Sequence, residues 1–189
     1  MDENKESEQR RNEFVDTAER LFHKNGIVET TISSIVKELD VAKGLFYYYF
    51  DSKEDVIDAI SEKYNSVFNE EIKRNLNEEY SQQKLNEFVE NVVSSFRELS
   101  AKLQGTSDEI DLTTLEKKTM TQAKDNAINS LEEVLEESVR LGDYAISQSK
   151  YYANILISGI VELVEQGEAT NEEIKEIILK LIEDVGKEK

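Results

Sequence analysis

The amino-acid sequence predicts an all-α fold, and three observations favour helices over strands. None of the 189 residues is proline, although average usage of roughly 5% would supply about nine. Glu, Lys, Leu and Ile are frequent, and most of these occur readily in helices. Apolar side chains also recur with the period of one helix face. A chain of this length can bury a sizeable hydrophobic core.

Residues 10–25 form the first predicted helix. Its apolar side chains share one stripe, and Gly26 ends it because glycine accepts the left-handed conformation of a C-terminal cap. Residues 1–8 are expected to be a disordered tail. Thr31 then caps a second predicted helix, 32–39. A third short helix is predicted over about 43–50.

Five consecutive aromatic residues, FYYYF, lie in the third predicted helix. At 100° per residue, Phe46 and Phe50 share the core face, Tyr48 points away, and Tyr47 and Tyr49 stand on the flanks. Such a trio of helices with an exposed polar aromatic face fits a helix-turn-helix motif, whose second helix enters the DNA major groove. An ordinary three-helix bundle with surface tyrosines fits the spacing equally well.

The rest of the chain is also predicted to form helices separated by short polar turns. Two pairs, Ser52 with Asp55 and Thr170 with Glu173, resemble capping boxes, which mark helix N-termini. The further predicted helices span residues 53–72, about 84–104, a long region that ends at 141–142, the segment between 147 and 166, and 170–186.

The composition indicates the cellular compartment and excludes some kinds of metal site. The chain has no cysteine, which excludes disulfides and thiolate metal sites. Its N-terminus lacks the apolar segment of a secretory signal. The most apolar stretch, 153–161, is shorter than the ~20 residues of a membrane span. We therefore expect a cytoplasmic protein without metal or cofactor.

The net charge of −18 argues at first against nucleic acid as a partner. Its distribution is uneven, however, with −3 over residues 1–8, 0 over residues 9–53 and −15 over residues 54–189. The predicted helix-turn-helix region is thus a neutral part of an acidic chain, which permits local contact with a polyanion.

An enzyme is poorly supported. His23 is the only histidine, so the sequence offers no Ser-His-Asp, Cys-His or HExxH arrangement. The seven glycines form no phosphate-binding loop, and the carboxylate clusters read as solvated helix faces.

Residues 10–57 resemble the N-terminal region of the tetracycline-repressor (TetR) family of bacterial transcription regulators. The resemblance rests on Leu21-Phe22 with Gly26, on Thr30-Thr31-Ile32, on Ile35-Val36 and Val41, and on Lys43-Gly44, Tyr47, Phe50 and Ser52-Lys53-Glu54. It implies an N-terminal helix-turn-helix DNA-binding domain at 9–68, with the motif at about 31–50, and a C-terminal helical ligand-binding and dimerisation domain at 69–189.

The resemblance also implies DNA contacts. Thr31 and Lys53 would bind phosphates, and Ser33 would lie near the groove. The base-reading positions would be occupied by Ala42, Lys43, Gly44 and Leu45. The DNA backbone or base edges would be met by Tyr47, Tyr48 and Tyr49. Three residues depart from the family pattern. Asp40 replaces a usual glycine, Ala42 replaces a capping Ser or Thr, and Leu45 replaces a common Thr but could touch a thymine methyl.

The C-terminal half is expected to form a homodimer and an inducer pocket, although both sets of residues could serve only the subunit core. The dimer candidates are Tyr152, Ile155, Leu156, Gly159, Ile160, Leu163, Ile174, Ile178, Leu181 and Ile182. The candidate pocket residues, for an unknown small molecule, are Phe68, Phe88, Phe96, Met120 and Tyr144.

The resemblance implies a dimeric repressor that binds a pseudo-palindromic double-stranded operator and is released by a ligand. The alternative is an interaction protein with the same fold, a co-activator or a cell-division factor, that has no small-molecule inducer. Release from DNA by a ligand would distinguish the two.

Overall fold

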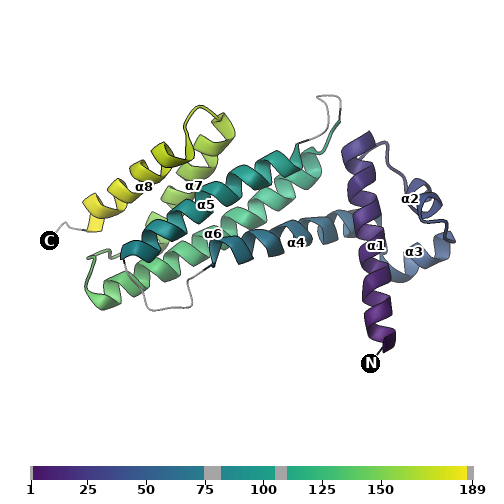
Figure 1. Cartoon of the computed structure of the whole chain (residues 1–189), viewed down its shortest axis with the longest axis horizontal. Helices are drawn as coiled ribbons and strands as arrows, with labels where there is room; N and C mark the ends of the chain where they lie inside the picture. Colours follow the sequence, from purple (N-terminus) through teal and green to yellow (C-terminus); the bar gives the residue numbers. More distant parts are fainter. Residues whose placement is uncertain (1, 75–81, 105–109, 187–189) are drawn as a thin grey trace. The chain divides into compact units, whose positions relative to one another are not determined.

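The computed structural model describes residues 2–74, 82–104 and 110–186. These residues contain eight helices and no strand, which confirms the all-α prediction (Figure 1). In chain order the helices are α1 Asp2–Asn25, α2 Ile32–Glu38, α3 Lys43–Tyr49, α4 Lys53–Ile72, α5 Gln82–Leu103, α6 Thr113–Leu141, α7 Ser149–Gln166 and α8 Asn171–Gly186.

The first helix starts earlier than the sequence predicts. It begins at Asp2 and includes residues that were expected to form a disordered tail. The described residues between Lys5 and Glu13 are exposed or half-buried, so no apolar stripe marks them. Glu, Lys, Gln and Arg are good helix formers even without such a stripe, and this stretch has no Gly or Pro that would end a helix.

The chain divides into two compact units. One comprises Met1–Tyr64 with Leu103–Thr119, and the other comprises Asn65–Lys102 with Met120–Lys189. The first unit therefore contains a segment from the middle of the chain, Leu103–Thr119. The expected domain boundary between residues 68 and 69 assigned this segment to the C-terminal domain. Within this unit the backbone N–H of Ile27 donates to the carbonyl of Asp111 at 3.1 Å, and Lys118 pairs with Asp58.

The core of the N-terminal unit is built around Phe14 of α1. Its ring centroid lies 5.8 Å from that of Phe46 and 6.3 Å from that of Phe50, both in edge-on geometry. Tyr49 contacts the same ring at 5.9 Å. Aromatic pairs at such distances and angles are favourable, so this cluster fixes α3 against α1.

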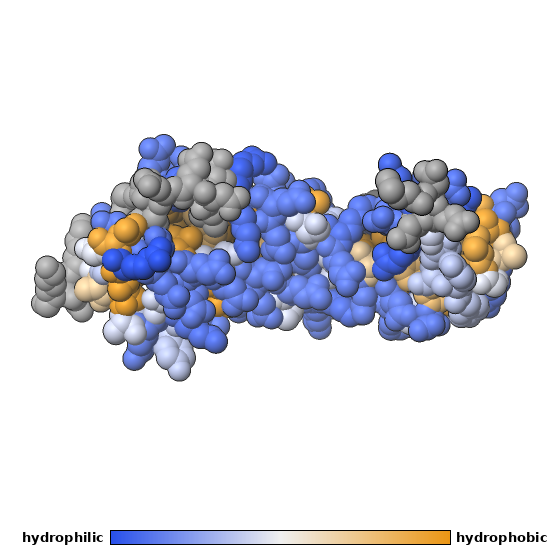
Figure 2. Space-filling view, turned by 90° about the horizontal axis from the view of Figure 1, so that it is seen from below, coloured by the Kyte–Doolittle hydropathy of each residue, from blue (hydrophilic) through white to orange (hydrophobic). Residues whose placement is uncertain are grey.

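The helices of the C-terminal unit are joined by buried aromatic and aliphatic side chains. Phe68 of α4 packs on Phe96 of α5 with ring centroids 4.8 Å apart. The turn before α8 is held by Arg97, which donates to the side chain of Asn171 at 2.6 Å and to the carbonyl of Ala169 at 2.7 Å. Figure 2 shows hydrophilic residues over most of the visible face, interrupted by hydrophobic patches.

Candidate nucleic-acid interface

Helix α2 begins at a reciprocal cap. The backbone N–H of Ser34 donates to the Thr31 hydroxyl at 3.1 Å, and the backbone N–H of Thr31 donates to the Ser34 hydroxyl at 3.0 Å. This arrangement satisfies donors that the first helical turn leaves free. Thr31 and Ser33 are exposed. The Thr31 hydroxyl is thus placed at the helix start, as expected, and it is already bound by the cap.

The turn between α2 and α3 passes through Asp40, whose φ is +52°. This left-handed conformation is uncommon for residues other than glycine, although Asp and Asn tolerate it better than most. It explains why the family pattern has glycine at this position. The Asp40 side chain is exposed, and the turn is closed by a hydrogen bond from the N–H of Val41 to the carbonyl of Val36 at 3.0 Å.

The aromatic run of α3 divides as the helical geometry predicts. Phe46 and Phe50 are buried, with 0% and 3% exposure, whereas Tyr48 is 73% exposed and Tyr47 is 49% exposed. Tyr49 is half-buried because its ring packs on that of Phe14. The predicted core and outward positions are confirmed, and Tyr47 and Tyr48 are both exposed to solvent.

The N-terminal turn of α3 is open. Ala42 occupies the N-cap without a side-chain hydrogen bond, and Ala42, Lys43 and Gly44 are all exposed. A Cβ placed on Gly44 would meet nothing within 4 Å. The Lys43 ammonium lies 5.8 Å from the centroid of the Tyr47 ring, within cation–π distance. Leu45, on the side facing α1, is half-buried.

Lys53 makes contacts that the sequence did not indicate. Its ammonium donates to the carbonyl of Ile27 at 2.7 Å and to that of Thr30 at 3.1 Å. Thr30 is fully buried, and its hydroxyl donates to the carbonyl of Gly26 at 2.8 Å. Lys53 therefore holds the loop between α1 and α2, and the third N–H of its ammonium remains for another acceptor.

Helix α4 is also tied to α1 by a polar cluster. The Tyr64 hydroxyl donates to Glu19 at 2.5 Å, and Lys63 pairs with Glu19 at 2.7 Å and with Asp16 at 2.6 Å. Burial, followed by the hydrogen bond to Glu19, raises the pKa of Tyr64 well above its usual range. The phenol is therefore neutral and acts as a donor at physiological pH.

The five candidate pocket residues are all buried. Phe68, Phe88, Phe96 and Met120 are 8% exposed or less. Tyr144 lies against the end of α8, where a Cβ on Gly186 would overlap its ring. The N–H of Ala145 donates to the carbonyl of Gly186 at 3.0 Å, so this part of the chain packs tightly on α8.

The dimer candidates fall into two groups. Five lie inside the subunit, where α7 packs on α8: Leu156, Ile160, Ile174, Ile178 and Ile182. Ile155 and Leu181 are exposed, and Tyr152, Gly159 and Leu163 are half-buried. The structure adds two large exposed apolar residues that the prediction omitted, Tyr151 at 67% and Ile177 at 48%.

The signal for the omitted residues was present in their spacing. Tyr151 and Ile155 are four residues apart on α7, and Ile177 and Leu181 are four apart on α8, so each pair shares one helix face. An apolar cavity of about 130 Å³ opens beside this surface, and Ile155 and Leu181 are among its lining residues.

Within the described parts of the chain, no group of three or more His, Cys, Asp or Glu residues is arranged to hold a metal ion. None of the described helices is long and apolar enough to cross a membrane.

Residues 14–60 match the family described as bacterial regulatory proteins, tetR family. Among curated relatives, the regulator HbdR of Aromatoleum sp. (strain CIB) is 33% identical over 69 residues, which are 36% of this chain and 30% of HbdR. The repressor KstR2 of Rhodococcus jostii is 39% identical over 51 residues, 27% of this chain and 25% of KstR2. The chain thus covers less than a third of these relatives.

Solved structures match over nearly the whole chain. A protein from Syntrophomonas wolfei, assigned to the TetR family of transcriptional regulators, has a TM-score of 0.68 at 18% identity and covers 95% of both chains. SmeT, the repressor of the Stenotrophomonas maltophilia efflux pump SmeDEF, has a TM-score of 0.62 at 21% identity over 91% of this chain and 87% of SmeT. SmeT has also been solved in complex with triclosan. At these identities the likeness shows the fold.

Proposed function

The N-terminal domain of this chain belongs to the tetR family of bacterial regulatory proteins, and we propose on that basis that the chain is a homodimeric transcriptional repressor released from its operator by a ligand. In this proposal α3 reads the major groove, the C-terminal unit forms the dimer, and a small molecule bound in that unit lowers the affinity for DNA.

The exposed face of α3 is the observation that carries the proposal. Phe46 and Phe50 anchor the helix to the core, while Lys43 and Gly44 at its start and Tyr47 and Tyr48 along it face solvent. A recognition helix contacts bases mainly through its N-terminal residues. Lys43 supplies a cation for guanine or phosphate, and the open surface at Gly44 lets base edges approach the backbone.

The dimer follows from the need for two half-sites. Reading two successive major grooves requires two copies about 34–36 Å apart. A paired apolar surface, formed by Tyr151 and Ile155 of α7 with Ile177 and Leu181 of α8, supports self-association because such a surface is costly to leave in water. Substituting Ile155→Glu or Leu181→Glu is expected to convert the dimer to a monomer in analytical ultracentrifugation, with helicity retained. A wild-type monomer at micromolar concentration would contradict this part of the proposal.

The proposed ligand occupies the C-terminal unit. Because Phe68 and Phe96 are buried in this unit, a ligand that contacts them would be apolar or aromatic. The complex of SmeT with triclosan supports a small molecule as a ligand of this fold. The ligand would act by a population shift, because it favours a spacing of the two α3 helices that no longer matches successive grooves.

The test is binding of the wild-type protein to the duplex immediately upstream of its own gene, measured by fluorescence anisotropy. Lys43→Gln should lower the affinity by about 1–3 kcal/mol if it reads a base. Lys102→Gln, which makes the same charge change on the exposed face of α5, is the matched control and should have little effect. Equal affinities of wild type and Lys43→Gln would contradict a base contact by Lys43.

A further inference from the structure

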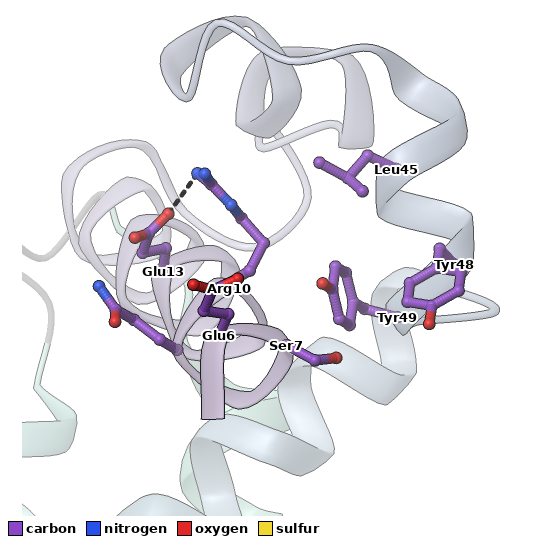
Figure 3. Close-up of a pocket in the computed structure, with 8 residues that line it drawn as sticks. Glu6, Ser7, Arg10, Glu13, Leu45, Tyr48 and Tyr49 are labelled. Carbon is purple, nitrogen blue, oxygen red and sulfur yellow. Dashed lines mark hydrogen bonds and ion pairs between the residues drawn. The ribbon is translucent and has the colours of Figure 1, made fainter. Parts of the chain in front are cut away.

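Beside α3 lies a groove whose other wall, on α1, contains none of the proposed DNA contacts. It has a volume of about 440 Å³ and is lined by Glu6, Ser7, Gln9, Arg10 and Glu13 of α1 and by Leu45, Tyr48 and Tyr49 of α3. Leu45 and Tyr49 point from α3 toward α1, as Figure 3 shows. The wall opposite α3 is therefore the early part of α1, which lies ahead of Phe14, its first buried residue in the described chain.

Of the eight described lining residues, Arg10 alone carries a positive charge. Its guanidinium donates to the Glu13 carboxylate at 2.5 Å, and the two side chains are 46% and 38% exposed (Figure 3). The neighbouring Arg11 is used differently, because its guanidinium lies 5.0 Å from the centroid of the Phe50 ring. Arg10 is thus the arginine of this pair that faces the groove.

A side chain across this groove from α3 would meet the DNA backbone. The major groove is about 12 Å wide, and a helix with its side chains is about as wide, so an element beside that helix lies against the flanking phosphates. An arginine can bind a phosphate through two parallel hydrogen bonds. An exposed ion pair between residues of one helix contributes little net stability, so a phosphate can replace Glu13 as the partner of Arg10.

We propose that Arg10 is a further DNA contact, made to a phosphate that flanks the groove entered by α3, and that Glu13 holds the guanidinium in the free protein and competes with the phosphate. This inference rests on the proposed DNA binding. Glu13 then lowers the affinity of the N-terminal unit for every polyanion, and exchanging Glu13 for a phosphate is part of binding.

The test compares Arg10→Gln and Glu13→Gln with wild type on two duplexes, the segment immediately upstream of the protein's own gene and a scrambled sequence of equal composition. The full-length protein is titrated over a range of salt concentrations. Arg10→Gln is expected to lower the affinity for both duplexes about threefold to tenfold and to reduce the salt slope by about 0.9, the value for one phosphate contact. Glu13→Gln is expected to raise both affinities, and less so in the Arg10→Gln background.

Two further sets of variants control for net charge and for packing. Glu137 and Arg140 form the same kind of ion pair, three residues apart, on α6 in the C-terminal unit. Glu137→Gln and Arg140→Gln therefore make identical charge changes in the unit that does not contain α3, and they should leave both affinities unchanged. Arg10→Lys should restore the salt slope but not the full affinity, because an ammonium lacks the planar fork of a guanidinium.

The outcomes separate this inference from the function on which it rests. If the wild-type protein binds neither duplex, both the proposed function and the inference about Arg10 are contradicted. If wild type binds and Arg10→Gln has the affinity and salt slope of Arg140→Gln, the inference alone is overturned. A loss of affinity with an unchanged salt slope also overturns it, because Arg10 would then act through the packing of α3.

Discussion

The ammonium of Lys53 lies 2.7 Å from the backbone carbonyl oxygen of Ile27 and donates a hydrogen bond to it. The same ammonium donates to the carbonyl of Thr30 at 3.1 Å. The first residue of α4 therefore closes the loop that leads into the helix-turn-helix motif. A residue predicted to bind phosphate also has a structural role, and the two roles can be measured separately.

Lys53→Met should lower the free energy of unfolding by about 1–3 kcal/mol, because two buried carbonyls lose a charged donor. Urea denaturation provides the measurement. Lys43→Met is the control, since Lys43 is exposed and its ammonium lies over the Tyr47 ring, and it should change stability by less than about 0.5 kcal/mol. An unchanged stability of Lys53→Met would mean that its two hydrogen bonds to the loop contribute nothing to folding.

The left-handed conformation of Asp40 predicts how that turn tolerates substitution. Asp40→Val should destabilise the protein by about 1–2 kcal/mol, because a β-branched side chain at positive φ crowds the backbone. Asp40→Gly should be close to neutral, since glycine accepts the conformation but loses more backbone entropy on folding. Thermal unfolding of the two variants tests the difference, and equal stabilities would argue against the left-handed turn.

A substitution at Gly44 is expected to affect stability and DNA binding in opposite directions. Its position in α3 is exposed and has open space around the Cβ site, so Gly44→Ala should stabilise the protein by up to about 1 kcal/mol. If base edges approach the backbone here, the same methyl group should weaken binding to the upstream duplex. Chemical denaturation and anisotropy measure the two effects. A variant that is more stable and binds DNA normally would place the bases further along α3.

The contact between Tyr144 and Gly186 predicts a large effect from a small change. Gly186→Ala should destabilise the protein by roughly 1–3 kcal/mol, because the added methyl group overlaps the buried Tyr144 ring. Gly159→Ala is the matched control, since a Cβ at that helical position meets nothing within 4 Å of its own subunit. The stability of both variants is compared by urea denaturation at equal protein concentration.

Glu173 predicts an acid-dependent contribution to the stability of α8. Its carboxylate accepts hydrogen bonds from the backbone N–H of Thr170 at 2.8 Å and from the Thr170 hydroxyl at 2.7 Å. The backbone hydrogen bond is the larger cause of its lowered pKa. Because the folded pKa lies below the unfolded value of ~4.3, the contribution is present above that value and is lost as the pH falls through the folded pKa.

Stability should therefore fall less steeply from about pH 5 to pH 3 in Glu173→Gln than in wild type. Urea titrations at several pH values give the two curves. Glu176→Gln removes the same charge from an exposed position of α8 outside the cap and serves as the control. Parallel curves for wild type and Glu173→Gln would show that the cap carries no pH dependence.

Most helices could be predicted because their signals are local. The predicted span of α4, 53–72, is the observed Lys53–Ile72, and the caps at Ser52 and Thr170 form as expected. The predicted start of α1 was wrong, because a charged helical segment without a buried face shows no apolar periodicity. The boundary between the two units could not be predicted from the sequence either. It reflects contacts between distant parts of the chain, such as the hydrogen bond between Ile27 and Asp111.

In the candidate site, too, some features follow from the sequence and others only from the tertiary structure. The sequence alone determined that Phe46 and Phe50 face inward and Tyr48 outward, because one rigid helix with a known repeat relates them. Tertiary structure decided that Leu156 is buried while Ile155 stays exposed, and that Lys53 binds two backbone carbonyls of an earlier loop. These outcomes depend on which neighbouring element each side chain meets, and apolar or basic character by itself does not specify that neighbour.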